Sequence, residues 1–174
     1  MVNIPSRSKL GKHWNLREST VFLNHGSFGA CPKEILAYQR QLRDQLEADP
    51  INFLDVKAKE LWTESIEIFS EFINADKNGL VFVPNATSGV NTVLRSLDLR
   101  HSDEILILDH TYQACWNAVD YATKKSGAKT TVVTLPFPIM GPEGIIESIL
   151  NSVTKNTKLA LIDTVTSPTG IRLP

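Results

Sequence analysis

The segment Val83–Asn91, with the sequence Val-Pro-Asn-Ala-Thr-Ser-Gly-Val-Asn, carries residues that could bind a phosphate group. It follows an apolar run, Leu80–Val83, that predicts a buried strand, and it leads into a helical pattern. The free backbone N–H groups at a helix N-terminus bind phosphate well, and Thr87 and Ser88 would add hydroxyl donors. Gly89 would let the backbone come close to such a ligand. Phosphate binding and simple capping of the helix by Thr87 or Ser88 are equally consistent with this pattern.

The same segment lacks the signatures of two common nucleotide-binding folds. No Gly-Lys-Ser/Thr follows the apolar run, which excludes a Walker loop. No Gly-x-Gly-x-x-Gly is present, which excludes the dinucleotide-binding fingerprint. A general phosphate- or nucleotide-binding α/β domain remains a minor alternative that rests on the segment around Thr87 alone.

A second group of polar residues, Asp109–Ala114, follows another apolar run, Ile105–Leu108. Ligands of open α/β sheets bind at the carboxyl ends of the strands, so this group and the Thr87 segment are predicted to face the same edge. The Tyr112 ring could stack there on a planar cofactor. The alternatives are a half-buried Tyr112 that closes the turn and a His110 that is an ordinary surface histidine.

A third polar segment, Asp163–Gly170, follows the apolar run Leu159–Ile162. Its hydroxyl groups could reach a ligand at the same edge of the sheet. The sequence Ser-Pro-Thr-Gly at 167–170 is also typical of a turn in which serine and threonine bond only to the backbone. The turn is the favoured interpretation when this segment is taken alone.

Apolar runs alternate with helical patterns along most of the chain, which indicates a mostly parallel sheet covered by helices on both faces. The predicted strands are Val21–Leu23, Leu80–Val83, Ile105–Leu108, Thr131–Val133 and Leu159–Ile162. The predicted helices run from Pro32 to Asp49, from about Lys57 to Ile73, from the Thr87 segment to Leu97, up to Lys125, and from Gly141 to Leu150. We therefore expect an α/β three-layer sandwich whose sheet is incomplete within these residues.

The composition excludes several classes of protein. The 174 residues carry a net charge of -1, which gives no reason to expect nucleic acid or an anionic membrane as a partner. No apolar run is long enough to span a bilayer, and the polar start, Met1–Leu16, does not resemble a secretory signal. Cys31 and Cys115 are the only cysteines, so neither a disulfide scaffold nor a zinc site is expected. A cytoplasmic protein fits these features best.

Four segments of the chain, in this order and spacing, resemble the class V aminotransferases: Phe22–Gly29, Asn85–Asn91, Asp109–Tyr112 and Val165–Gly170. This family belongs to fold type I of the enzymes that use pyridoxal 5'-phosphate (PLP) and includes the cysteine desulfurases. The Leu-Asn-His-Gly-Ser-Phe-Gly opening and the Asn-Ala-Thr loop are most similar to the isopenicillin N epimerase-like branch. The resemblance covers nearly the whole chain and implies the N-terminal part of the PLP-dependent transferase large domain.

The resemblance implies where PLP would bind. Ala86 and Thr87 would hold the phosphate group through backbone N–H groups and the Thr87 hydroxyl. Tyr112 would stack on the pyridine ring, where desulfurases have a histidine, and His110 would take this role if the register differs by two residues. Ser167 falls where desulfurases place an asparagine near the phenolic oxygen of the cofactor.

The resemblance also implies a domain division and a substrate side. Residues 1–30 would form an N-terminal arm in which Asn24, His25 and Gly26 lie near the substrate. Residues 31–174 would form the N-terminal portion of the PLP-binding large domain. The complete protein would be a homodimer that acts on an amino acid or amine, as an epimerase, a lyase or desulfurase, or an aminotransferase.

The chain departs from the family pattern after Gly170. In family members the aspartate that pairs with the pyridine nitrogen and the Schiff-base lysine follow the segment that matches Val165–Gly170, whereas only four residues follow it here. None of the later lysines has a matching context: Lys124, Lys125, Lys129, Lys155 and Lys158. Because PLP chemistry needs both groups, we predict no catalytic residue in this chain and no activity of the chain alone. The alternative is a non-catalytic α/β protein that binds a partner or a phosphate ligand.

Overall fold

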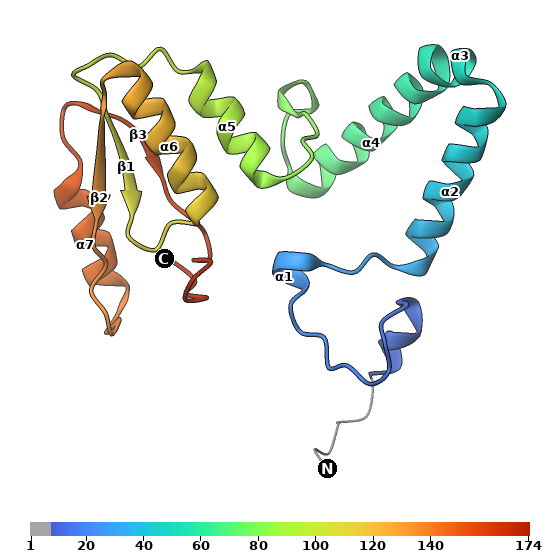
Figure 1. Cartoon of the computed structure of the whole chain (residues 1–174), viewed down its shortest axis with the longest axis horizontal. Coiled ribbons are helices and arrows are strands. Elements are labelled where there is room, and N and C mark those ends of the chain that lie inside the picture. The colour runs from blue at the N-terminus through green and yellow to red at the C-terminus, as the bar shows by residue number, and fades with distance from the viewer. Residues whose placement is uncertain (1–7) are drawn as a thin grey trace. The chain divides into compact units, whose positions relative to one another are not determined.

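The computed structural model describes residues 8–174 of the chain, which divides into two compact units. Unit 1 is Met1–Val81 and unit 2 is Phe82–Pro174. Unit 1 is helical, and unit 2 contains a parallel sheet with helices on both faces (Figure 1). Among residues 8–174, every helix is too short or too polar to span a bilayer. The boundary predicted at residue 30 concerns the domains of the complete enzyme and stays a prediction.

Unit 1 consists of helices joined by loops. They are η1 (Lys9–His13), α1 (His25–Phe28), α2 (Lys33–Ala48), α3 (Pro50–Asn52), the π-helical turn η2 (Phe53–Lys57), α4 (Ala58–Ile73) and η3 (Lys77–Gly79). The helix predicted from Pro32 to Asp49 is confirmed as α2. Asp49 caps the next helical segment, because its Oδ1 atom accepts a hydrogen bond from the backbone N–H of Asn52 at 3.2 Å. The helical path therefore runs from Pro50 into α4 and begins earlier than the predicted start near Lys57.

Unit 2 is built on three parallel strands, β1 (Glu104–Leu108), β2 (Lys129–Val133) and β3 (Thr157–Leu161). Their order in the sheet is β2-β1-β3, so β1 is central and pairs with both neighbours. These strands confirm the predictions for Ile105–Leu108, Thr131–Val133 and Leu159–Ile162. The helices of this unit are α5 (Ala86–Ser96), α6 (Gln113–Ser126) and α7 (Pro142–Ser152).

Two other predicted strands, Val21–Leu23 and Leu80–Val83, do not form. A strand is stabilised by hydrogen bonds with a neighbouring strand, and within the described residues neither segment pairs with another. Side chains in both segments are open to solvent, with Leu23 87% exposed and Val81 71% exposed. The predictions were wrong because an apolar run favours burial but does not supply the strand that must lie beside it.

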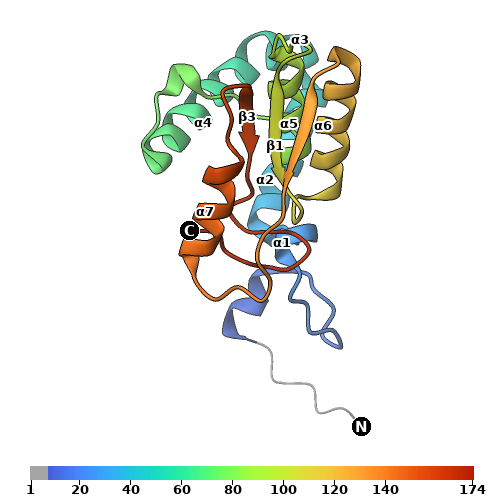
Figure 2. The same ribbon diagram turned by 90° about the vertical axis from the view of Figure 1, so that its left-hand side faces the viewer.

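The side chains of β1 alternate between two apolar layers. Ile105 and Ile107 are buried against α5 and α6, whereas Leu106 and Leu108 are buried against Ile145 of α7. Successive residues of a strand point to opposite faces, so a strand that is apolar throughout needs helices on both faces. Figures 1 and 2 show α6 on one side of the sheet and α7 on the other. The predicted α/β three-layer sandwich is thereby confirmed.

The two crossover connections explain why α6 and α7 lie on opposite faces. β1 connects through α6 to β2 on one side, and β2 connects through α7 back across β1 to β3. Parallel crossovers are almost always right-handed, so two crossovers that run in opposite directions place their helices on opposite faces. The direction of strand order therefore reverses at β1, and ligands of open α/β sheets bind outside the carboxyl ends of the strands at such a reversal.

Candidate functional site

The loops that leave β1 and β3 meet at the carboxyl edge of the sheet. The backbone N–H of Tyr112, after β1, donates a hydrogen bond to Oδ2 of Asp163, after β3, at 3.3 Å. The Nδ1 atom of His110 lies 3.0 Å from Oγ1 of Thr169, which also follows β3. From this edge the chain after β1 goes to α6 on one face, whereas Leu173 returns to the core on the α7 face. The predicted meeting of these two segments at one edge is therefore observed.

The His110 ring is held from several sides. Beside its contact with Thr169, its Nε2 atom lies 3.9 Å from Asp109 Oδ1, and its ring centroid lies 6.3 Å from that of Phe137. Asp109 is fixed in turn, because its Oδ1 atom accepts a hydrogen bond from the backbone N–H of Leu135 at 3.2 Å. The side chain of His110 is only 15% exposed. Residues that follow all three strands thus orient this ring.

Tyr112 has a different environment. It stands at the N-cap position of α6 and is 46% exposed, and its side chain makes no capping hydrogen bond. Its backbone is held by Asp163, but among the described residues its ring has neither a hydrogen-bond partner nor an aromatic neighbour. The Tyr112 ring is therefore accessible to a ligand, while no protein contact fixes its orientation.

The first turn of α5 leaves two backbone N–H groups without an acceptor. Asn85 caps the helix: its Oδ1 atom accepts from the N–H of Ser88 at 2.8 Å, and its carbonyl oxygen accepts from the N–H of Gly89. The N–H groups of Ala86 and Thr87 come earlier and have no acceptor within the helix. The half-buried Thr87 hydroxyl has no hydrogen-bond partner in the described part of the chain. Capping by Thr87 or Ser88 is therefore a wrong interpretation, since Asn85 has that role.

The start of α5 faces the same side of unit 2 as the loops after the strands. Figure 1 shows the N-terminal ends of α5 and α6 on the side toward which β1 points. Gly89 lies in the first turn of α5, and a Cβ atom there would come 3.7 Å from Val83 Cγ2, which is an ordinary contact. Packing within the protein therefore does not require a glycine at this position.

The segment Asp163–Gly170 forms a turn around the buried Thr166. The Thr166 hydroxyl accepts a hydrogen bond from the backbone N–H of Ile171 at 2.9 Å and lies 2.7 Å from Oγ1 of Thr169. The interpretation of this segment as a turn whose hydroxyls bond to the backbone is confirmed for Thr166. Ser167 is exposed, and its side chain makes no hydrogen bond within the described residues. The sequence did not distinguish Thr166 and Thr169 from the other hydroxyl residues of the segment. The only sequence signal for a role of these two threonines was that their segment follows an apolar run.

Asn24, His25 and Gly26, the predicted substrate-side residues, lie in unit 1 at the start of α1. His25 shapes a local turn, because its Nδ1 atom accepts a hydrogen bond from the backbone N–H of Ala30 at 3.4 Å. The Phe22 ring meets His25 edge-on, with 4.7 Å between ring centroids. These local contacts explain the form of the segment, and its role toward a substrate stays a prediction.

The lysines of unit 2 lie away from the carboxyl edge. Lys124 and Lys125 belong to the last turn of α6, Lys129 begins β2, and Lys155 and Lys158 lie at the amino end of β3. The amino ends of parallel strands form the opposite edge of the sheet from their carboxyl ends. Unit 2 therefore presents no lysine at the edge where His110, Thr169 and Asp163 meet.

Cys115, in the first turn of α6, is buried close to the carboxyl edge. Burial raises the pKa of its thiol, and the negative charge of Asp163 raises this pKa further. Both effects favour the neutral thiol, so Cys115 is poorly suited to act as a nucleophile. Within residues 8–174, no group of three or more His, Cys, Asp or Glu side chains is arranged to hold a metal ion.

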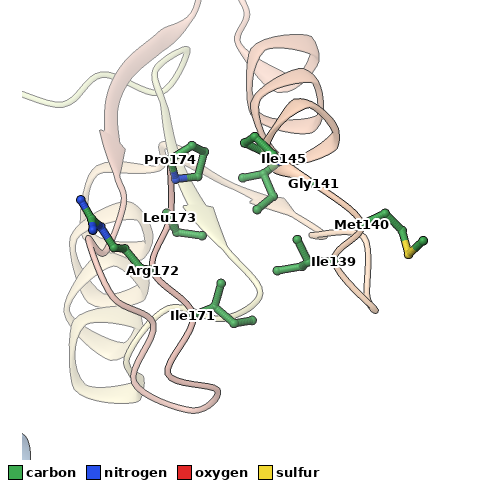
Figure 3. Close-up of a pocket in the computed structure, with 9 residues that line it drawn as sticks. Ile139, Met140, Gly141, Ile145, Ile171, Arg172, Leu173 and Pro174 are labelled. Atoms are coloured by element: carbon green, nitrogen blue, oxygen red, sulfur yellow. The ribbon is translucent and has the colours of Figure 1, made fainter.

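A cavity of about 520 Å³ lies elsewhere in unit 2 (Figure 3). None of the residues that meet at the carboxyl edge, such as His110 and Thr169, lines it. It is lined by Ile139, Met140, Gly141, Pro142, Ile145, Ile171, Arg172, Leu173 and Pro174. Figure 3 shows the charged end of Arg172 directed away from the side of Ile139 and Met140. Ligand sites usually have several convergent polar groups, whereas Arg172 is the only polar side chain among these lining residues.

The parallel α/β layers and the polar loops at their carboxyl edge are the features of an open α/β fold, in which ligands bind outside the ends of the strands. The chain belongs to the class V aminotransferase family: residues 31–174 match the family model described as Aminotransferase class-V. The resemblance seen in the sequence is thereby confirmed at the level of the family, which uses PLP.

Curated relatives are similar to this chain over most of its length. The chain is 34% identical over 168 residues to the probable chloroplastic L-cysteine desulfhydrase of Arabidopsis thaliana. It is 30% identical over 162 residues to the isopenicillin N epimerase of Streptomyces clavuligerus. These alignments cover 87% and 91% of this chain but only 35% and 40% of the two relatives. The chain thus spans well under half the length of the curated relatives it matches.

Solved structures show the same partial coverage. The chain superposes on the cystine C-S lyase C-DES, in complex with its reaction product cysteine persulfide, with a TM-score of 0.81 and 22% identity. The match covers 88% of this chain and 40% of that one. The cysteine desulfurase CsdA of Escherichia coli matches with a TM-score of 0.76 and 17% identity, over 98% of this chain and 44% of that one. These similarities confirm the predicted fold class.

Proposed function

We propose that the complete protein binds PLP at the carboxyl edge of unit 2 and acts on an amino acid or amine. The observation that carries this proposal is the first turn of α5, where two backbone N–H groups and the Thr87 hydroxyl have no partner within the described residues. Such a turn binds phosphate through hydrogen bonds and the helix dipole. When bound, PLP supplies an electron sink for chemistry at the α-carbon of an amino acid.

The residues of this edge fit the parts of PLP. Ala86 and Thr87 would donate hydrogen bonds to the phosphate group. Packing does not explain Gly89, and a glycine there would let the phosphate approach the backbone. A ring at the end of β1 would lie against the pyridine, and Ser167 would lie near the phenolic oxygen. The part of the protein described here would thus bind and orient the cofactor.

Two rings, His110 and Tyr112, are candidates for the place against the pyridine. The family pattern favoured Tyr112. The contacts of His110 with Thr169, Asp109 and Phe137 support His110, because a ring that is oriented before binding loses less conformational freedom when a ligand arrives. Tyr112 remains the alternative.

Replacement of His110 by alanine in the complete protein is expected to weaken PLP retention by about 2- to 12-fold, the usual value of one aromatic stacking contact. It should also shift the absorbance of the bound cofactor. Tyr112→Ala should have a smaller effect on both measurements, and Tyr112→Phe should have none. Dialysis followed by absorbance spectroscopy measures both. A larger loss in Tyr112→Ala than in His110→Ala would assign the stacking role to Tyr112.

Replacement of Thr87 by valine tests the phosphate site itself. Valine keeps the shape of threonine and removes the hydroxyl, so one charge-assisted hydrogen bond is lost, worth about 1.5–3 kcal/mol. PLP affinity of the complete protein should fall by roughly tenfold or more. Thr87→Ser is the matched control, because serine keeps the hydroxyl. Equal affinity of the wild type and Thr87→Val, with circular dichroism unchanged, would refute the phosphate site at α5.

The remaining chemistry is assigned to parts of the complete protein other than unit 2. Since unit 2 presents no lysine at its carboxyl edge, we infer that the Schiff-base lysine and the aspartate beside the pyridine nitrogen come from other parts of the complete protein. The names of the relatives, L-cysteine desulfhydrase and isopenicillin N epimerase, support a reaction of the lyase or epimerase type. A homodimeric, cytoplasmic enzyme is part of the same proposal.

A further inference from the structure

Three side chains from distant parts of unit 2 form a continuous chain of hydrogen bonds. His110 Nδ1 lies 3.0 Å from Thr169 Oγ1, and Thr169 Oγ1 lies 2.7 Å from Thr166 Oγ1. Thr166 is 1% exposed, and its hydroxyl is anchored to the backbone of Ile171, whose N–H donates to it at 2.9 Å. The chain therefore begins in the core and ends on the ring of His110.

Each hydroxyl in this chain has one proton to donate and can accept two bonds, so the two tautomers of His110 define two kinds of arrangement. In the first, Thr166 donates to Thr169 and Thr169 donates to His110 Nδ1, so that the proton of the neutral imidazole is on Nε2. In the second, His110 Nδ1 donates to Thr169, and the exposed Thr169 hydroxyl donates either to Thr166 or to solvent. Both arrangements use the 2.7 Å contact between the two threonines, so the choice between them rests on the surroundings of the other ring nitrogen.

The surroundings of the other ring nitrogen favour the first arrangement. His110 Nε2 lies 3.9 Å from the Asp109 carboxylate, which attracts an N–H group and repels a lone pair. The Asp109 carboxylate is itself held by the N–H of Leu135. The ring is therefore biased toward a proton on Nε2 and an acceptor on Nδ1, the state in which Thr169 donates to Nδ1.

We infer that Thr169 is a positioning residue: it orients the His110 ring and fixes its tautomer through the hydroxyl chain from Thr166. The inference rests on the proposed function for its consequence, because an oriented His110 ring is the one that would lie against the pyridine of PLP. Thr169 itself is exposed and would act only through His110.

The experiment uses the complete protein, freed of PLP and labelled with nitrogen-15 in histidine, at about pH 8.5, above the ordinary titration range of histidine. The His110 signals are assigned by their loss in His110→Gln. In the wild type, the shifts should show Nδ1 as the acceptor and the proton on Nε2. Thr169→Val removes one hydrogen bond, so the ratio of the two tautomers should fall by about 2- to 10-fold. Thr169→Ser should restore it.

Thr164→Val is the matched control, because it makes the same change in an exposed threonine of the same loop whose side chain has no hydrogen bond among the described residues. An unchanged tautomer ratio in Thr169→Val would overturn the inference, as would an equal change in Thr164→Val.

PLP retention is then measured in each variant. Loss in His110→Gln without loss in Thr169→Val would overturn the positioning role. Full retention in His110→Gln would instead refute the assignment of His110 to the cofactor, whatever the tautomer ratio shows.

Discussion

A polypeptide of these 174 residues, produced alone, is expected to show no turnover of amino acids with PLP and no PLP attached to one particular lysine. Chemistry with PLP requires a lysine that reaches the cofactor. The lysines of unit 2 lie at the amino edge of the sheet or in the last turn of α6, whereas the proposed phosphate site lies at the first turn of α5. Any reaction of PLP with these lysines should therefore be unselective.

Borohydride reduction followed by peptide mapping tests this prediction. We expect small amounts of pyridoxyl adduct spread over several surface lysines, such as Lys124, whose Nζ lies 2.7 Å from Asp120 Oδ2 in an exposed ion pair. The complete protein, treated in the same way, should give one stoichiometric adduct. A single saturable adduct on the 174-residue polypeptide, together with amino-acid turnover, would show that the chain carries its own catalytic lysine.

Replacement of Ile145 by alanine in the complete protein is expected to lower the free energy of unfolding by about 2–5 kcal/mol. Ile145 is 2% exposed and packs from α7 onto the layer formed by Leu106 and Leu108 of the central strand. The loss combines the transfer of the deleted side-chain atoms with the cost of the cavity that they leave. Urea unfolding followed by circular dichroism measures the change.

The neighbouring residue Ile146 provides the matched control. It lies on the same helix and is 45% exposed, so Ile146→Ala should cost far less than Ile145→Ala. A loss below about 1 kcal/mol for Ile145→Ala would contradict the packing of α7 on this face of the sheet. A large loss for Ile146→Ala would show that the outer face of α7 is covered in the complete protein.

The placement of the candidate site depends on the topology of the sheet more than on any one motif. β1 is the strand at which the strand order reverses, and the loops after it and after β3 leave toward opposite faces. The hydrogen bonds between Tyr112 and Asp163 and between His110 and Thr169 join residues that are 51 and 59 positions apart. A family that varies these loops can change the site while the sheet beneath them stays the same.

The sequence by itself determined the elements of unit 2 and the class of the protein. Apolar runs such as Ile105–Leu108 predicted the strands, because a strand buried on both faces must be apolar at every position. The order of the four family segments pointed to class V aminotransferases, the family that residues 31–174 match. These features are local in the chain, so a sequence displays them directly.

Only the tertiary structure decided which residues act together. Leu80–Val83 has the composition of a strand, yet within the described residues no neighbour pairs with it. Asn85 rather than Thr87 caps α5, which leaves the Thr87 hydroxyl without a partner in the described part of the chain. The His110 ring is held by Thr169 while the Tyr112 ring is not held, although the two residues are close in sequence. The physical reason is that a hydrogen bond needs both partners in position, and the partner is supplied by a strand order that no local pattern encodes.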